Sequence, residues 1–222
     1  MKIRVVSYNI RHGHDVELDM SLIAADILSV DADVVGLQEV DVGTSRVHGR
    51  DTLVELAAAA GFAHYAFCRA IDFAGGEYGT AILSRYPIRS FAVIPLPCEG
   101  ANEMRSVSRA ILDVHGERVE FFNTHLSYES HALRVPQFKA LAALTEKCPA
   151  WVLTGDFNTA DLGSFSVFGS ASLANPGQYP TFPGTGEGID NIVCNAPWRI
   201  KATGVLPRSH SDHLLLWAEL IK

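Results

Sequence analysis

Apolar residues recur along this chain in two periods, one typical of buried β-strands and one of helices that lay a single face on a sheet. Apolar, β-branched runs predict strands over residues 3–8, 33–40, 62–68, 80–84, 88–96, 107–114, 118–124, 151–158, 189–194, 200–206 and 214–220. Helical spacing predicts helices over residues 20–30, 51–60 and 131–147, with Asp19 and Asp51 as N-caps. Strands and helices alternate early and hairpins dominate the middle, so we expect mixed sheets with helices outside.

Two polar segments interrupt this pattern. Residues 72–79 contain Gly75-Gly76 and are expected to form a loop before the strand at 80–84. Residues 159–188 are rich in Gly, Ser, Pro and Thr, which predicts a long loop with one short helix near 161–168. A loop of that length in a compact domain is usually functional, and the sequence leaves open whether it closes over a substrate.

Composition indicates a globular protein with an ample core. The chain has 222 residues, 48% of them hydrophobic, with no Pro/Ser-rich linker and no repeat, so we expect one domain over 1–222. No apolar run approaches the length of a membrane span, and the N-terminus lacks the features of a signal peptide. The four cysteines are far apart and are read as reduced thiols. We therefore expect a cytoplasmic, monomeric protein without membrane insertion.

The net charge of the chain bears on whether the protein binds nucleic acid. A charge of −7 and few lysines argue against a broad nucleic-acid surface, although a local basic groove remains compatible with them.

The chemistry-bearing residues gather at the ends of predicted strands. Carboxylate, carboxamide or imidazole side chains fall at or near the ends of several separate strands, at Asn9, Glu39, Asn123, His125, Asp156, Asn158, Asp190, Asp212 and His213. If these ends converge, they form an oxygen-rich pocket with two imidazoles. Such a donor set suits Mg²⁺ or Mn²⁺ better than zinc, which prefers His and Cys.

Seven short segments, in order along nearly the whole chain, resemble the motifs of the endonuclease/exonuclease/phosphatase superfamily, whose fold is like that of deoxyribonuclease I. These segments are Ser7-Tyr8-Asn9-Ile10-Arg11, Leu37-Gln38-Glu39-Val40, residues 78–85, Asn123-Thr124-His125-Leu126, Gly155-Asp156-Phe157-Asn158-Thr159, Ile189-Asp190-Asn191-Ile192 and Ser211-Asp212-His213. The resemblance implies a four-layer α/β/β/α sandwich of two packed mixed sheets flanked by helices, with a metal site at one end.

The same resemblance implies a role for each matching residue. Glu39 resembles the principal metal-binding glutamate, with Asn9 beside it and Asp212 as a further carboxylate near the metal. Asp156 and Asn158 resemble the pair that orients the nucleophile and contacts the phosphate. The remaining implied roles are hydrogen-bond donation to the phosphoryl oxygens by His125 and an Asp–His pair formed by Asp190 and His213. We assign His213 as the general base, oriented by Asp190. The resemblance leaves open whether Asp156 takes the proton instead, and the sequence does not say whether one or two ions are used.

The expected function is that of a Mg²⁺- or Mn²⁺-dependent phosphoesterase acting on a phosphodiester or phosphomonoester. Arg46, Tyr78 and Asn123 are the candidate substrate-binding residues, because a guanidinium, a phenol and an amide can each hold a phosphate oxygen. The alternatives are a DNA endonuclease or exonuclease of the same superfamily and, less favoured, a binding module without turnover.

Overall fold

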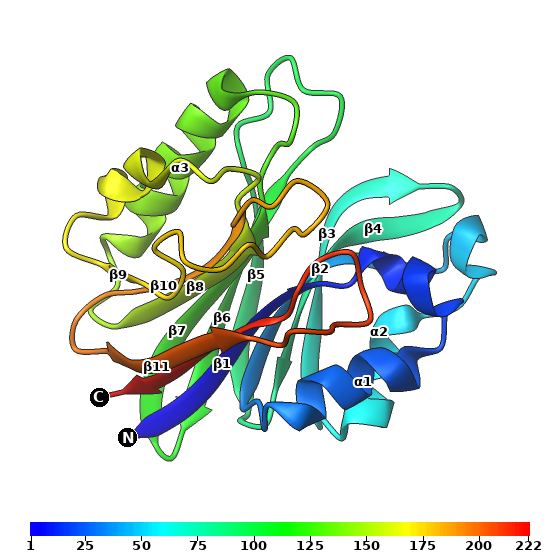
Figure 1. The fold of residues 1–222 in the computed structure, drawn as a ribbon, viewed down its shortest axis with the longest axis horizontal. Helices are drawn as coiled ribbons and strands as arrows, with labels where there is room; N and C mark the ends of the chain where they lie inside the picture. The colour runs from blue at the N-terminus through cyan, green and yellow to red at the C-terminus, as the bar shows by residue number, and fades with distance from the viewer.

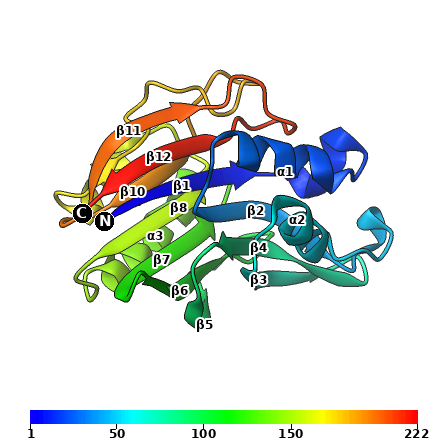
Figure 2. The same cartoon turned by 90° about the horizontal axis from the view of Figure 1, so that it is seen from below.

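The computed structural model describes residues 1–222 and contains two mixed six-stranded sheets packed face to face. The first sheet has the order β11 (Arg199–Val205), β12 (Leu216–Ile221), β1 (Lys2–Asn9), β2 (Val34–Val42), β4 (Gly76–Ser84) and β3 (His64–Phe73). Figure 2 shows this row of strands from below. The second sheet has the order β5 (Ile88–Pro95), β6 (Ser106–Val114), β7 (Glu117–His125), β8 (Trp151–Asp156), β10 (Asp190–Cys194) and β9 (Ser172–Leu173).

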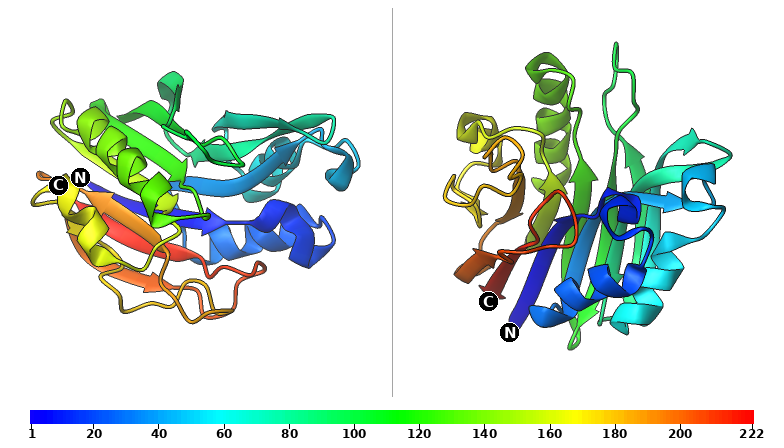
Figure 3. Two further views of the ribbon diagram at one scale, coloured as in Figure 1. Left: turned by 90° about the horizontal axis from the view of Figure 1, so that it is seen from above. Right: turned by 45° about the vertical axis from the view of Figure 1, so that its right-hand side comes forward.

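Helices form the two outer layers. The first sheet is covered by α1 (Met20–Ser29) and α2 (Thr52–Ala60), and the second by α3 (His131–Thr145), as Figures 1 and 3 show. Three short 3₁₀ helices, η1 (Arg11–Val16), η2 (Ser45–Val47) and η3 (Leu162–Phe168), lie in the connections. The expected four-layer sandwich is confirmed.

Three hydrophobic clusters fill the spaces between these layers. The first cluster joins α1 and α2 to the first sheet, the second lies between the sheets, and the third joins α3 and η3 to the second sheet. Ile23 and Ile27 on α1, Val5 and Phe121 between the sheets, and Phe138 on α3 are all almost fully buried. Burial of this apolar surface is the main force holding the layers together.

Each sheet contains one pair of parallel neighbours, and these two pairs determine where the site lies. β1 runs parallel to β2, and β7 runs parallel to β8, whereas all other neighbours are antiparallel. The carboxyl ends of parallel neighbours share one edge, and polar residues there can converge. Asn9 at the end of β1 donates to Asp156 at the end of β8 with 3.0 Å between Nδ2 and Oδ2, so the two edges meet.

The predicted local elements agree with the structure except in the loop expected over 72–79 and at the two-residue strand β9, which lies inside the long loop expected over 159–188. Asp19 and Asp51 cap α1 and α2 as expected, accepting from the backbone N–H groups of Ser21 and Val54. The short helix expected near residues 161–168 is η3. The loop expected over 72–79 was wrong, because only residues 74 and 75 turn between β3 and β4.

Gly79 explains why the pairing continues through that segment. A Cβ at residue 79 would lie 2.1 Å from the carbonyl oxygen of Cys68, so only glycine lets the two strands approach this closely.

None of the helices has both the length and the apolar character needed to cross a lipid bilayer.

Candidate functional site

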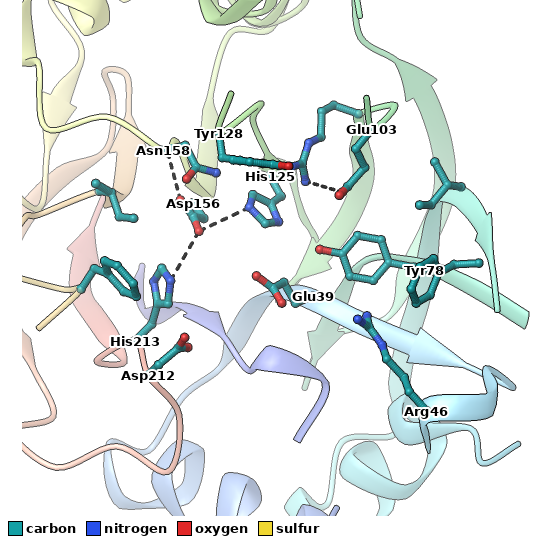
Figure 4. Close-up of a pocket in the computed structure, with 15 residues that line it drawn as sticks. Glu39, Arg46, Tyr78, Glu103, His125, Tyr128, Asp156, Asn158, Asp212 and His213 are labelled. Atoms are coloured by element: carbon teal, nitrogen blue, oxygen red, sulfur yellow. Dashed lines mark hydrogen bonds and ion pairs between the residues drawn. The ribbon is translucent and has the colours of Figure 1, made fainter. Parts of the chain in front are cut away.

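The predicted site residues gather around one cavity of about 380 Å³ at the strand ends. Eight of them line it: Glu39, Arg46, Tyr78, His125, Asp156, Asn158, Asp212 and His213. Figure 4 shows Glu39 between the Asp156–His213 side of the cavity and the Tyr78–Arg46 side. Asn9 and Asp190 reach the cavity only through hydrogen bonds to lining residues.

Asp156 is the centre of the hydrogen-bond network. It ends β8, is 2% exposed, and its Oδ1 accepts from the backbone N–H of Asn158 at 2.9 Å. Its Oδ2 lies 3.4 Å from Nε2 of His125 and 3.7 Å from Nε2 of His213. Asn158, with a φ of +50°, turns the chain here and donates from Nδ2 to the Leu126 carbonyl at 2.9 Å. Two imidazoles therefore face a single buried carboxylate.

His213 is held between two carboxylates. Its Nδ1 lies 2.8 Å from Oδ2 of Asp190, the first residue of β10, and its ring packs on Phe182 with 4.8 Å between centroids. Because Asp190 and Asp156 are register partners on neighbouring antiparallel strands, they flank the ring from two sides. Asp156, Asp190 and His213 also have ligand atoms within 4.8 Å of one another. The two ring nitrogens of His213 thus each face a different carboxylate, Nδ1 that of Asp190 and Nε2 that of Asp156, an arrangement that suits proton transfer.

Burial and charge shift the pKa values of this group. Burial alone would lower the pKa of His213, but the carboxylates of Asp190 and Asp156 outweigh it and raise that pKa. Burial, followed by the charge of Asp190, raises the pKa of Asp156, so it gains a proton more readily than an ordinary aspartate. Burial, then the positive charge of Arg105, holds the pKa of His125 well below its usual range, which keeps its ring neutral. His125 can therefore donate one ring N–H without carrying charge.

Glu39 stands on a strained turn of the backbone. Its φ is +57°, in the left-handed region that non-glycine residues rarely adopt, and the β2–β4 register shifts between Leu37 and Val40. This bulge turns the carboxylate to the cavity, where Oε1 accepts from Nδ2 of Asn9 at 3.1 Å. Asn9 also accepts from the Arg11 backbone N–H at 3.0 Å, so its amide is committed to orienting Glu39 and Asp156.

Asp212 lies on the loop before β12. Nε of Arg11 is 3.5 Å from its Oδ2, and its backbone N–H donates to Asp15 at 3.2 Å. Its carboxylate is partly exposed and lines the cavity beside His213 (Figure 4).

Arg46 and Tyr78 form the opposite wall with Phe73. Arg46 is bound bidentately to fully buried Asp41, with both N···O distances 2.7 Å, and its guanidinium stacks on Phe73 at 4.6 Å. No local pattern indicated Asp41 as its partner. Because two of its nitrogens are occupied, Arg46 acts first as a support of this wall. The phenol of Tyr78 lines the cavity.

The predicted role of Asn123 in substrate binding does not agree with its position. The residue is fully buried between the sheets, where Nδ2 donates to the carbonyls of Leu37 and Ala81 at 2.8 and 3.0 Å. Its Oδ1 accepts from Gln38 and Thr154 at 2.7 and 3.0 Å. All of its hydrogen-bonding groups are used within the protein, so Asn123 links the two sheets.

Sequence reasoning did not find the other seven lining residues, among them Arg105, Glu103, Tyr128 and Phe182. Arg105 is 3% exposed, lies 2.8 Å from Glu103, and has an Nε with no hydrogen-bond partner. Its sequence context is a polar turn, and the signal that could have revealed it is an arginine entering a buried strand. A buried guanidinium on the wall of a polar cavity is a candidate anion ligand.

Comparisons with known proteins agree with this geometry. The sequence profile of the Endonuclease/Exonuclease/phosphatase family matches residues 6–213. None of the curated proteins compared with the chain matches it significantly.

Solved structures give the same fold. An endonuclease/exonuclease/phosphatase from Beutenbergia cavernae DSM 12333 superposes with a TM-score of 0.84 at 26% identity, covering 99% of this chain and 71% of that one. A mannosyl-6-phosphatase from Bacteroides thetaiotaomicron gives 0.78 at 21%, covering 99% and 100%. D. rerio TDP2, complexed with a single-strand DNA product, gives 0.77 at 16%, covering 100% and 99%. With its profile match, its two-sheet sandwich and the convergence of its strand-end motifs, the chain belongs to the endonuclease/exonuclease/phosphatase family.

Proposed function

We propose that this protein is a Mg²⁺- or Mn²⁺-dependent phosphoesterase that hydrolyses a small phosphodiester or phosphomonoester. One observation carries the proposal: the Asp190–His213 pair, Asp156 and His125 face one cavity that also contains the carboxylate of Glu39. Hydrolysis of a phosphoester needs a placed water, a proton acceptor and stabilisation of charge on the phosphoryl oxygens. The side chains around this cavity can meet all three needs.

Each residue has a task in this proposal. Asp156 and Asn158 place the attacking water, and the Asp156–His213 pair takes its proton. The two groups titrate as a unit because they share one buried environment. Asp190 holds the His213 ring by its Nδ1 atom, which leaves Nε2 toward the cavity. His125 donates a hydrogen bond to a phosphoryl oxygen.

The donor set fits a hard divalent cation. Of the four carboxylates that line the cavity, Glu103 is paired with Arg105, whereas Glu39 has no cationic partner within 4.0 Å. Carboxylate oxygens without a paired cation are preferred ligands of Mg²⁺ and Mn²⁺. Glu39 would hold the ion, and Asn9 would keep Glu39 oriented. Asp212, whose partly exposed carboxylate faces Arg11 at 3.5 Å, would be the further ligand. When bound, the ion would neutralise charge on the phosphate and stabilise the leaving oxygen.

The shape of the cavity favours a small substrate. A volume of about 380 Å³ suits a small molecule, and a net charge of −7 opposes binding along a nucleic-acid backbone. The structural relatives include a mannosyl-6-phosphatase and a TDP2 bound to single-strand DNA product, so both substrate classes belong in a test. DNA cleavage is the second candidate function.

The deciding experiment is a substrate panel with Mg²⁺ or Mn²⁺, comparing wild type with His213→Ala. The panel contains sugar phosphates, inositol phosphates, glycerophosphodiesters, sphingomyelin, a chromogenic diester, RNA, single-stranded DNA and abasic duplex DNA. We expect a small phosphoester to be cleaved, EDTA to stop cleavage, and the variant to lose roughly a hundredfold or more in kcat. Cleavage of DNA alone would replace the proposal by its alternative, and turnover unaffected by His213→Ala would refute the assigned site.

A further inference from the structure

We propose that Asp26 and His210, which lie outside the cavity, are positioning residues that hold the loop of residues 206–215 so that His213 and Asp212 face the substrate. The activity part of this inference rests on the proposed function, whereas its structural part does not.

Asp26 is a buried carboxylate whose bonds are made to other elements. It is 4% exposed and is the one charged residue among the buried positions of α1, which otherwise include Ile23 and Ile27. Its Oδ2 accepts from the backbone N–H of His210 at 2.7 Å, and its Oδ1 lies 2.8 Å from Nδ1 of the same residue. A buried carboxylate destabilises a protein unless it is fully hydrogen-bonded. The two bonds to His210 therefore offset the cost of burying Asp26.

The third hydrogen bond of Asp26 is made to Tyr8 on β1, the strand that ends at Asn9. The hydroxyl of Tyr8 donates to Oδ2 at 2.7 Å, and burial together with the negative charge of Asp26 raises the pKa of Tyr8, so the phenol stays a donor. Tyr8 immediately precedes Asn9, which orients Glu39 and Asp156. A single carboxylate on α1 thus connects the end of β1 with the loop that carries His213.

The loop is tied to the protein on other sides as well. The hydroxyl of Ser211 donates to the carbonyl of Asn9 at 2.8 Å, and the backbone N–H of Leu214 donates to Thr181 at 2.7 Å. The bond to Asp15 noted above is longer and more exposed. Asp26 supplies the buried attachment toward α1. It binds His210, which is three residues before His213, and the ring of His213 must keep its distance to Asp156. A displacement of about 1 Å at a reacting group can cost on the order of a hundredfold in rate.

The test uses variants of Asp26 and His210 with a matched control on the same helix. Asp26→Ala removes both hydrogen bonds between the loop and α1. His210→Ala removes only the bond made by the His210 ring, and Asp26→Asn keeps an acceptor for the His210 backbone N–H. Asp19→Ala removes the N-cap of α1 and so weakens the helix without touching the loop. Kinetics are measured on the substrate identified in the panel, well below each melting temperature.

We expect Asp26→Ala to lower kcat roughly ten- to hundredfold with little change in KM. We expect His210→Ala to lower it a few-fold, Asp26→Asn to recover most of the loss, and Asp19→Ala to lower the melting temperature at unchanged kcat. An unchanged kcat in both Asp26→Ala and His210→Ala, or an equal loss in Asp19→Ala, would overturn the inference.

A second readout needs no activity. The ring signals of His213 in ¹H–¹³C NMR, assigned by their absence in His213→Ala, should shift or broaden in Asp26→Ala but not in Asp19→Ala. Amide exchange of residues 206–215 should become faster in the same variant. If wild type cleaves nothing, the proposed function fails, and these signals still decide the inference. Unchanged signals and exchange would overturn it even in an active enzyme.

Discussion

Nδ1 of His213 lies 2.8 Å from Oδ2 of Asp190, and the other carboxylate oxygen of Asp190 is buried without a partner. The whole hydrogen-bonding strength of this carboxylate is thus directed at one imidazole nitrogen. A neutral amide at this place could not stabilise a protonated ring, and it could turn its NH₂ group toward Nδ1.

Asp190→Asn should therefore lower kcat by roughly a hundredfold or more, with KM nearly unchanged, because the ring loses both its orientation and its charge partner. Steady-state kinetics on the cleaved substrate checks this, with circular dichroism as the control for folding. A variant that retains wild-type kcat would show that Asp190 does not support His213 in catalysis.

Glu39→Gln should weaken Mn²⁺ binding at least tenfold, because it removes the cavity carboxylate that no cation of the protein neutralises. Isothermal titration calorimetry of metal-free protein measures this directly. Glu103→Gln is the matched control, since that carboxylate lines the same cavity but is paired with Arg105. Equal affinities in wild type and Glu39→Gln would show that Glu39 is not a metal ligand. The group formed by Asp156, Asp190 and His213 would then be the next metal site to test.

Arg105→Gln should raise KM for the phosphoester roughly tenfold, because a buried guanidinium donates charge-assisted hydrogen bonds to an anion. Arg109→Gln, four residues further on in β6, is the control, as Arg109 pairs with Glu120 and does not line the cavity. Thermal melts identify any loss due to folding. If both variants have the KM of wild type, Arg105 does not bind the substrate, and its role is limited to the ion pair with Glu103.

Asn123→Ala should destabilise the protein by about 3 kcal/mol or more, because it leaves several buried hydrogen-bonding groups of both sheets unpaired. Its KM should stay unchanged at temperatures where the variant is folded. His125→Ala, two residues further on, should show the reverse pattern, with kcat reduced and stability less affected. Denaturant unfolding and kinetics on both variants separate the two roles, and a raised KM in Asn123→Ala would restore the residue to the substrate site.

Stability of the metal-free protein should fall as pH rises above neutrality. The folded pKa of His213 is raised from 6.5 to about 10, so its protonated form stabilises the fold fully below pH 6.5, and this contribution is lost between pH 6.5 and about 10. Thermal melts in EDTA across this window should decline less steeply for His213→Gln than for wild type. Parallel curves would mean that His213 is not protonated in the folded protein at neutral pH.

Much of the fold was predictable because its signals are local. Strand and helix periods, and the caps Asp19 and Asp51, depend on neighbours within a few residues, and the structure contains them as expected. The strand-end positions of Glu39, Asp156 and His213 were visible for the same reason, since each follows or precedes an apolar run. The pair Gly75-Gly76 misled the prediction, because only Gly75, with a φ of +83°, belongs to the turn, whereas Gly76 is required where the chain approaches the backbone of Val42 and Gly43 closely.

The roles of Asn123 and His125 show what local patterns cannot decide. Both lie on β7 two residues apart and so share a face of the sheet, but Asn123 lies deeper. A Cβ at Gly36 would lie 2.6 Å from Oδ1 of Asn123, so the two sheets nearly touch there. His125 lies where they part and the cavity begins. Depth between two sheets depends on how they pack, and no single strand encodes it.

By itself, the sequence determined the elements, the fold class and most of the polar residues at the strand ends, because each is specified by hydrophobic period, capping and motif order. Only the tertiary structure decided which of those residues share a cavity and which brace it. Arg46 is paired with Asp41 five residues away, whereas Asp26 and His210 are separated by 184 residues. Such pairs form where buried charge finds a partner in space, and the identity of that partner emerges only when the sheets and helices are packed together.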